Sequence, residues 1–228
     1  MKSAVWAVVP VKTLGNAKER LAPILSPAER ANLSRTMLAD VFNALAGCSG
    51  LRGVLVVTND VDARSLSRKH GFDTLNDLVG TGPSEAVRRG LAHLGNQVCD
   101  GVLALMADIP LLTATDVDEM LAAHNRTPAV TLAPSRDGKG TNAAFCSPPD
   151  AIPLTFNGRG LAGHIAQGSQ LNIETHRLDL PRLALDIDLP EDLAALLEVP
   201  SASKTQAYLR DIGGHRRLRD YLFSLKVE

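Results

Sequence analysis

The sequence predicts an α/β domain in which helices cover both faces of a mostly parallel sheet. Short apolar runs alternate along the chain with segments whose apolar residues recur every three or four positions. Strand and helix therefore follow one another repeatedly, which is typical of a three-layer fold around a parallel sheet. Runs such as residues 54–58 lack a polar alternation, which indicates strands that are buried on both faces.

The first strand and the first long helix have the clearest boundaries. Residues 4–11 form an apolar run rich in valine, which predicts a strand. Ser26 can cap a helix, Pro27 suits its first turn, and Glu29 completes a capping box. Gly47 is a suitable residue to end this helix.

The remaining elements follow from run lengths and from helix breakers. Gly71 ends the second helix, a Gly-Pro pair opens the third, and a glycine-rich loop around Gly138 separates two strands. Strands are predicted at residues 54–58, 101–108, 129–134, 142–146, 174–178 and 183–187, and helices at residues 62–70, 82–94, 115–124, 160–167 and 190–197.

The composition argues against several classes of protein. The chain has 228 residues, of which 45% are hydrophobic, so it can bury a sizeable core. Its 24 basic and 25 acidic side chains give a net charge of −1, which does not favour nucleic acid or an anionic membrane as a partner. The three cysteines are isolated, which predicts no disulfide framework and favours the cytoplasm. No apolar run approaches the roughly 20 residues that span a bilayer.

A change of composition divides the chain near residue 199. We expect one domain at residues 1–199 and a basic amphipathic tail at residues 200–228. The tail could be a solvated helix, or it could pack on the domain or on a second copy, which makes a homodimer possible. The residues available for packing are Tyr208, Leu209, Leu218, Tyr221, Leu222 and Phe223.

Carboxylates end two of the predicted strands. Asp108 follows a buried run, and Asp186 and Asp188 follow a second run near the C-terminus. Ligands of open α/β sheets bind at the carboxyl ends of the strands, and Mg²⁺ prefers carboxylate oxygens. These residues therefore predict one magnesium site, although Asp186 and Asp188 would face opposite sides of a strand. The alternative is that either residue caps the helix that begins at Pro190.

A basic loop follows the first strand at the same predicted edge of the sheet. Lys12, Lys18 and Arg20 lie within nine residues, which suits a polyphosphate. The loop has neither the spacing of a P-loop nor that of a dinucleotide-binding fingerprint. An ordinary charged surface loop explains this segment about as well. Together, the basic loop and the predicted magnesium site favour chemistry on a nucleoside triphosphate.

Two glycine-rich segments offer further binding groups. Residues 76–85 run into a helix, whose free N–H groups can hold an anion. Thr141 and Asn142 follow a similar loop and could donate to a carboxylate or a phosphate. His164 could face the same site. Ordinary turns, and a histidine satisfied within the protein, explain these features equally well or better.

Taken together, these segments resemble the 2-phospho-L-lactate guanylyltransferase family of deazaflavin coenzyme biosynthesis. The likeness extends over residues 4–197, and it rests on the order and spacing of several short motifs. These are residues 9–12 (VPVK), 18–21 (KERL), 108–111 (DIPL), 140–143 (GTNA), 147–150 (SPPD) and 186–193 (DIDLPEDL), with His164 between the last two.

The resemblance implies a glycosyltransferase-A-like nucleotidyltransferase. Its members join the GMP part of GTP to the phosphate of a three-carbon acid and release pyrophosphate. The acceptors are 2-phospho-L-lactate, phosphoenolpyruvate and 3-phospho-D-glycerate. By this likeness Asp108, Asp186 and Asp188 would bind magnesium, Lys12 and Lys18 would meet the triphosphate, and Thr141 would contact the acceptor carboxylate. We further expect Lys12, Lys18 and Arg20 to be catalytic, by stabilising the departing pyrophosphate. The other expected contacts are with the nucleotide, from Pro10, Val11, Lys12, Gly82, Pro83 and Ser84, and with the acceptor, from Asn142, Arg159, Gly160 and His164.

Two departures from the family pattern bear on the substrates. Gly82-Pro83-Ser84 stands where the family often has Gly-Leu-Asn, which leaves the guanine selectivity open. Gly160 stands where the family tends to have a serine, so a hydroxyl is missing at this position. Arg159, the residue before it, adds a cation. We therefore expect an acceptor other than 2-phospho-L-lactate. The alternatives are another nucleotidyltransferase of the same fold, of sugar-phosphate or molybdopterin type, and a non-catalytic nucleotide-binding subunit.

Overall fold

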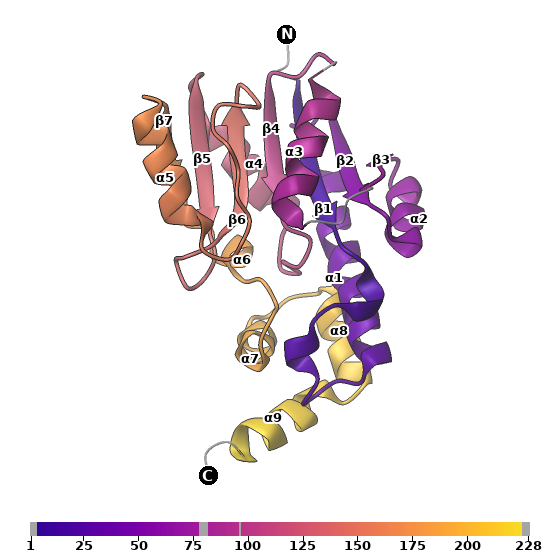
Figure 1. Ribbon diagram of the computed structural model, residues 1–228. Helices are drawn as coiled ribbons and strands as arrows, with labels where there is room; N and C mark the ends of the chain where they lie inside the picture. Colours follow the sequence, from indigo (N-terminus) through magenta and orange to yellow (C-terminus); the bar gives the residue numbers. More distant parts are fainter. Residues whose placement is uncertain (1–3, 78–81, 96, 225–228) are drawn as a thin grey trace.

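A twisted sheet of seven strands runs through the upper part of the molecule (Figure 1). The computed structural model describes residues 4–77, 82–95 and 97–224. In the order β3-β2-β1-β4-β6-β5-β7, all strands are parallel except β6, which is antiparallel to both of its neighbours. The strands are β1 (Val5–Val11), β2 (Gly53–Thr58), β3 (Asp73–Leu75), β4 (Gly101–Leu105), β5 (Ala129–Pro134), β6 (Thr141–Ser147) and β7 (Glu174–Arg177).

Helices cover both faces of the sheet, so the predicted three-layer α/β fold is confirmed (Figure 1). The helices are α1 (Pro27–Gly47), α2 (Val61–Lys69), α3 (Pro83–Leu94), α4 (Ala114–Ala123), α5 (Gly160–Gln170), α6 (Pro181–Ala184), α7 (Pro190–Glu198), α8 (Lys204–Asp211) and α9 (Gly214–Ser224), with two 3-10 turns, η1 (Leu14–Asn16) and η2 (Glu19–Leu21). None of the described helices has the length and the apolar character that a bilayer span requires.

Successive side chains of the central strands pack in two separate hydrophobic cores, one on each face of the sheet. In β1, Val9 packs with α1 and α4, whereas Val8 packs with α3 and α5 on the other face. The same alternation holds in β4, where Leu103 and Val102 belong to opposite cores. Such strands have no polar side, which explains why their runs in the sequence lack alternation.

The capping box that the sequence predicts for α1 is present. The Ser26 hydroxyl accepts a hydrogen bond from the Glu29 N–H, and the Glu29 carboxylate accepts one from the Ser26 N–H at 2.8 Å. Asp60 caps α2 in a similar way. The edge strand β3 was not anticipated, because it has only three residues and none of them is buried.

The predicted strand at residues 183–187 is wrong. The segment begins in the short helix α6 and then crosses the end of the sheet, where Ile187 donates its N–H to the Asp108 carbonyl at 3.1 Å. Its apolar residues Leu185 and Ile187 are buried in a third core and not against a neighbouring strand. A segment outside the sheet that buries alternate residues therefore shows the same apolar pattern in the sequence as a strand does. Asp186 and Asp188 are consequently not placed by strand alternation.

The third core lies beyond the carboxyl ends of the strands, where Figure 1 draws η2, α7, α8 and α9 together. It joins Leu21 from the loop after β1, Ile187 and Leu193 from the segment of the C-terminal aspartates, and Leu209 and Leu218 from the tail. The tail therefore packs on its own chain. Helix α8 also contacts α1 directly.

Asp40 of α1 fixes the start of α8. Its carboxylate accepts hydrogen bonds from the N–H groups of Lys204 and Thr205, at 2.8 and 2.9 Å, and from the Thr205 hydroxyl at 2.7 Å. The carboxylate thus serves as the N-terminal cap of a helix more than 160 residues further along the chain.

Asp40→Asn is expected to lower the free energy of unfolding by about 1–3 kcal/mol, because one amide oxygen cannot replace a buried carboxylate with three donors. Urea denaturation measures the change. Asp211→Asn, at the exposed C-terminal end of α8, serves as the control and should have little effect. Equal midpoints for the two variants would show that the Asp40 contacts contribute no stability.

Candidate active site

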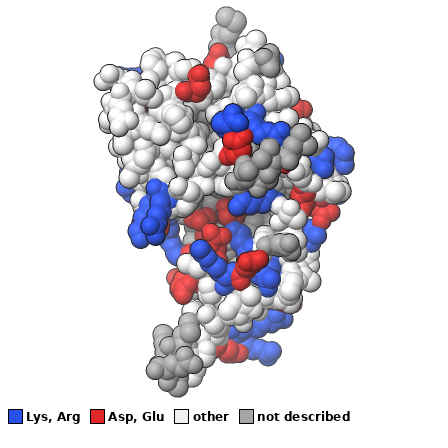
Figure 2. Space-filling view, viewed as in Figure 1, with Lys and Arg blue, Asp and Glu red and all other residues white. Residues whose placement is uncertain are grey.

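A cavity of about 500 Å³ opens at the carboxyl edge of the sheet. Figure 2 shows acidic and basic side chains gathered around a hollow on this face. Eight of the residues that the sequence singled out line the cavity, namely Pro10, Val11, Lys12, Lys18, Arg20, Pro83, Asp108 and Asp188. The expected convergence of the basic loop with the carboxylates is therefore present among the described residues.

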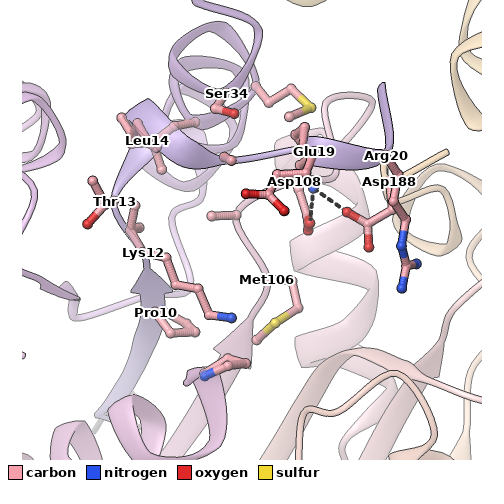
Figure 3. Close-up of a pocket in the computed structure, with 17 residues that line it drawn as sticks. Pro10, Lys12, Thr13, Leu14, Glu19, Arg20, Ser34, Met106, Asp108 and Asp188 are labelled. Carbon is pink, nitrogen blue, oxygen red and sulfur yellow. Dashed lines mark hydrogen bonds and ion pairs between the residues drawn. The ribbon is translucent and has the colours of Figure 1, made fainter. Parts of the chain in front are cut away.

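The first strand delivers the basic residues to the cavity. Pro10 and Val11 end β1, and Lys12 follows directly. Leu14 then anchors the loop, because its N–H donates to the Asp60 carboxylate at 2.9 Å. Figure 3 shows Lys12 and Arg20 extending on opposite sides of Asp108 in that view.

Lys18 lies between two carboxylates. Its Nζ donates to Asp108 Oδ2 at 2.6 Å and to Asp188 Oδ1 at 2.7 Å, as the dashed lines in Figure 3 mark. Only 9% of the Lys18 side chain is exposed. Burial disfavours the charged ammonium, but the attraction and hydrogen bonds of Asp108 and Asp188 outweigh it and raise the pKa of Lys18 above its ordinary value. Lys18 is therefore a permanent cation in this arrangement.

The C-terminal aspartates have unlike environments. Burial and the nearby charge of Asp108 raise the pKa of Asp186 above its ordinary value. Burial would raise the pKa of Asp188 as well, but the charges of Lys18, Arg20 and Lys12 outweigh it and lower that pKa. Asp188 therefore loses its proton more readily than Asp186 does.

Asn142 holds Asp186 and the segment before it. The amide Nδ2 lies 3.0 Å from Asp186 Oδ1 and 3.1 Å from the carbonyl oxygens of both Leu183 and Ala184. At the same point of the sheet, the carbonyl of Asn142 accepts the Met106 N–H at 2.9 Å. Asn142 therefore connects the end of β4 with the aspartate segment, and its own side chain is buried.

The carboxylates fit a magnesium ion in part. Asp108 and Asp188 both reach the same ammonium nitrogen, so they are spaced to share one cation. Mg²⁺ needs only one or two protein carboxylates when phosphate oxygens and water complete its octahedron. Across the described residues, however, no three His, Cys, Asp or Glu side chains form a ready cage. The donor set suits an ion that arrives with a phosphate ligand.

A second cluster surrounds Thr141 at the start of β6. The Thr141 hydroxyl lies 3.1 Å from His164 Nδ1, and His164 Nε2 accepts the N–H of Thr155 at 2.8 Å. Since Nε2 accepts, Nδ1 carries the proton and donates it to Thr141. Burial lowers the pKa of His164 to about 4, so the ring is neutral. His164 is only 1% exposed and thus orients the Thr141 hydroxyl from inside the protein.

Gly160 has a steric reason to be glycine. An added Cβ would lie 2.2 Å from the Thr155 carbonyl oxygen and 3.1 Å from the His164 ring. A serine hydroxyl at this position is therefore incompatible with the observed approach of residue 155. Arg159, the residue before, is exposed and makes no side-chain ion pair with the described residues.

The three residues Gly82, Pro83 and Ser84 have different structural roles. Gly82 has a φ of 112°, which favours glycine, and Pro83 lines the cavity. The Ser84 hydroxyl accepts the Phe156 N–H at 2.8 Å, which connects the start of α3 with the segment that leads to α5. Residues 78–81 of the predicted anion-binding loop lie outside the described residues.

The cavity and the Thr141 cluster are separate groups of residues. Asp186, Gly82, Ser84, Thr141, Asn142, Arg159, Gly160 and His164 do not line the cavity. Conversely, three residues of α1, Ser34, Met37 and Leu38, do line it, and so does Met106 after β4. The apolar periodicity of the helix marked that face as core, and nothing in the sequence separated the wall of a site from ordinary packing.

Solved proteins described as nucleotide-transferring enzymes share this fold. A protein from Desulfovibrio desulfuricans G20 described as a nucleotide-diphospho-sugar transferase superimposes with a TM-score of 0.77 over 96% of this chain and 98% of its own, at 19% identity. A nucleotidyl transferase from Methanothermobacter gives a TM-score of 0.58 over 91% and 99% of the chains, at 15% identity.

The family is narrower than the fold. Residues 5–219 match the family described as guanylyl transferase CofC like, and the chain belongs to this family. It is 34% identical to a phosphoenolpyruvate guanylyltransferase of Conexibacter woesei, over 86% of this chain and 88% of that protein. It is 36% identical to one of Rubrobacter xylanophilus, over 85% and 93%. A 2-phospho-L-lactate guanylyltransferase of Methanothermobacter thermautotrophicus is 30% identical over 90% of both.

His164 should remain neutral well below its ordinary titration range. A histidine whose folded pKa is about 4 contributes stability that is complete above about 6.5 and is lost as the pH falls toward 4. The whole effect is about 3 kcal/mol. NMR of the labelled imidazole rings, with His164→Gln to assign the signal, should show the neutral Nδ1–H form at pH 5. Half-protonation of this ring near pH 6.5 would contradict the assigned hydrogen bonds.

Proposed function

We propose that this chain transfers GMP from GTP to the phosphate of a three-carbon phospho-acid in deazaflavin coenzyme biosynthesis. The observation that carries the proposal is the meeting of Lys12, Lys18 and Arg20 with Asp108 and Asp188 around one cavity. A site that alternates cations with metal-binding carboxylates suits a triphosphate and its counter-ion. Membership of a guanylyltransferase family supports guanosine as the nucleoside.

The reaction needs charge neutralisation more than it needs proton transfer. An oxygen of the acceptor phosphate attacks the α-phosphorus of GTP, a new P–O bond forms, and the bond to the β-phosphate bridging oxygen breaks, so that pyrophosphate leaves. The attacking oxygen is already anionic at neutral pH. Lys12, Lys18 and Arg20 are the residues proposed to stabilise charge on the departing pyrophosphate, and positioning with electrostatics would supply most of the acceleration.

Asp108 and Asp188 are the residues that would hold Mg²⁺, with Asp186 oriented beside them by Asn142. The ion would supply charge neutralisation and orientation of the phosphates. Pro10, Val11, Pro83 and the neighbouring Gly82 and Ser84 are proposed to contact the nucleoside.

The acceptor is proposed to bind on the β6 side of the site. Thr141, with its hydroxyl oriented by His164, supplies a donor for the acceptor carboxylate, and Arg159 supplies an exposed cation at the start of α5. Gly160 cannot offer a hydroxyl there. This chemistry favours phosphoenolpyruvate or 3-phospho-D-glycerate over 2-phospho-L-lactate, and the phosphoenolpyruvate guanylyltransferases among the relatives support that order.

Pyrophosphate release with GTP and Mg²⁺ tests the function directly. Each of the three acceptors is supplied in turn, and CTP, UTP and ATP replace GTP in parallel. The expected result is release with GTP and with phosphoenolpyruvate or 3-phospho-D-glycerate. A preference for 2-phospho-L-lactate would reject the acceptor assignment, and a preference for another nucleotide would reject the guanylyl assignment.

Asp108→Asn is expected to reduce kcat by about 100-fold or more, because the ligand for the metal and the partner of Lys18 are both weakened. The thermal midpoint should change little, since Asp188 still pairs with Lys18 and the asparagine oxygen can still accept a hydrogen bond from the ammonium. Asp62→Asn, at the exposed start of α2, is the matched control. Near-normal turnover at saturating Mg²⁺ would remove Asp108 from the mechanism.

Arg159→Met is expected to raise the KM for the acceptor by about tenfold, because a charge-assisted contact to the carboxylate is lost. The KM for GTP should change little. Arg177→Met, an exposed arginine on β7, controls for a general loss of positive charge. An unchanged acceptor KM would place the carboxylate away from α5.

A further inference from the structure

Lys18 is held in place by contacts that reach across the whole chain. Its partners, Asp108 and Asp188, lie 90 and 170 residues away in the sequence, and both lie within 2.7 Å of the ammonium nitrogen. The side chain is almost fully buried, whereas the two carboxylates remain 29% and 49% exposed. The ammonium thus lies between the two carboxylates, and both aspartates line the cavity.

The backbone at Lys18 is in a costly conformation. Its φ of 58° and ψ of 43° lie in the left-handed region, which a residue with a side chain rarely adopts. Both flanks are fixed, since Leu14 is bound to Asp60 and Leu21 is fully buried. The ion pairs therefore offset the unfavourable backbone, and a long flexible side chain joins an anchored loop to the carboxylates.

One ammonium lies between two carboxylates, so this contact by itself does not balance their negative charge. A divalent cation between the same oxygens would carry twice the charge. It would need Mg–O distances of about 2.1 Å, and it could not share the space with an ammonium hydrogen-bonded to both acids.

We propose that Lys18 and a divalent cation bind Asp108 and Asp188 in mutually exclusive states. Without metal, Lys18 takes the position of the cation and keeps the carboxylates together. Metal binding displaces the ammonium into the adjoining cavity, which Lys12 and Arg20 also line and where phosphate oxygens are the natural anionic partner. Metal binding would thereby free the Lys18 ammonium to contact the phosphate oxygens that bind with the metal. The inference rests on the proposed function, since it assigns the divalent cation to that site.

Metal binding to the nucleotide-free protein is the test, with Mn²⁺ as the probe and its free concentration measured by electron paramagnetic resonance. Lys18→Met should lower the Mn²⁺ dissociation constant by about tenfold or more, because the metal no longer has to displace a paired cation. Lys12→Met removes the same charge from the same cavity without vacating the carboxylates, and it should have a clearly smaller effect. Circular dichroism verifies that each variant is folded.

A chemical readout on the wild-type protein follows Lys18 itself. Reductive methylation, read by mass spectrometry, should modify Lys18 slowly in metal-free protein and several-fold faster when Mn²⁺ alone is added. Lys69, which is exposed at the end of α2, should react at the same rate in both conditions. This measurement remains informative if Lys18→Met does not fold.

The outcomes separate this inference from the function. If Lys18→Met binds Mn²⁺ no more tightly than the wild type, or no more tightly than Lys12→Met, the competition is refuted. Lys18 reactivity that does not respond to Mn²⁺ refutes it as well. Guanylyl transfer by the wild type would then still support the proposed function. If Mn²⁺ binding does not depend on Asp108, as judged with Asp108→Asn, the metal assignment fails together with the competition.

Discussion

The contact of Lys18 with Asp108 and Asp188 is the interaction on which the site depends. It joins the loop after the first strand, the segment after the fourth and the chain before α7, three regions that are remote in the sequence. The Lys18 ammonium is almost fully buried, so it would be costly without a carboxylate partner. The cavity beside them exists because these segments meet without filling the space between them.

A hydrophobic core supports that meeting from behind. Leu21, three residues after Lys18, and Ile187, one residue before Asp188, belong to the same buried cluster as Leu209 and Leu218 of the tail. The tail thus forms the back of the site and is more than a solvated basic helix. Gln206 adds to it by donating to the carbonyls of Leu196 and Val199 at the end of α7. Helices α8 and α9 therefore pack in the same core as the residues next to the basic loop and the C-terminal aspartates.

The antiparallel strand β6 positions the residues that we propose for acceptor binding. Because β6 runs opposite to its neighbours, its first residues, Thr141 and Asn142, lie at the edge where β4 ends. Thr141 is oriented by the neutral His164, and Asn142 connects Met106 with the aspartate segment. The reversed direction of one strand thus brings the Thr141 hydroxyl and the amide that contacts Asp186 to the same edge of the sheet.

Local sequence determined the elements whose signals are local. The α1 capping box, the buried strands and the basic residues after β1 could be predicted because each depends on neighbouring side chains. The segment at residues 183–187 could not, since alternate burial in a third core and alternate burial in a sheet leave the same apolar pattern. Nor could the sequence assign Lys18 to two aspartates, or Asn142 to three partners, because those contacts depend on the paths of distant segments. The sequence therefore predicted which residue types the site contains. Their pairing was determined by tertiary packing, because packing alone sets the distances between the charges.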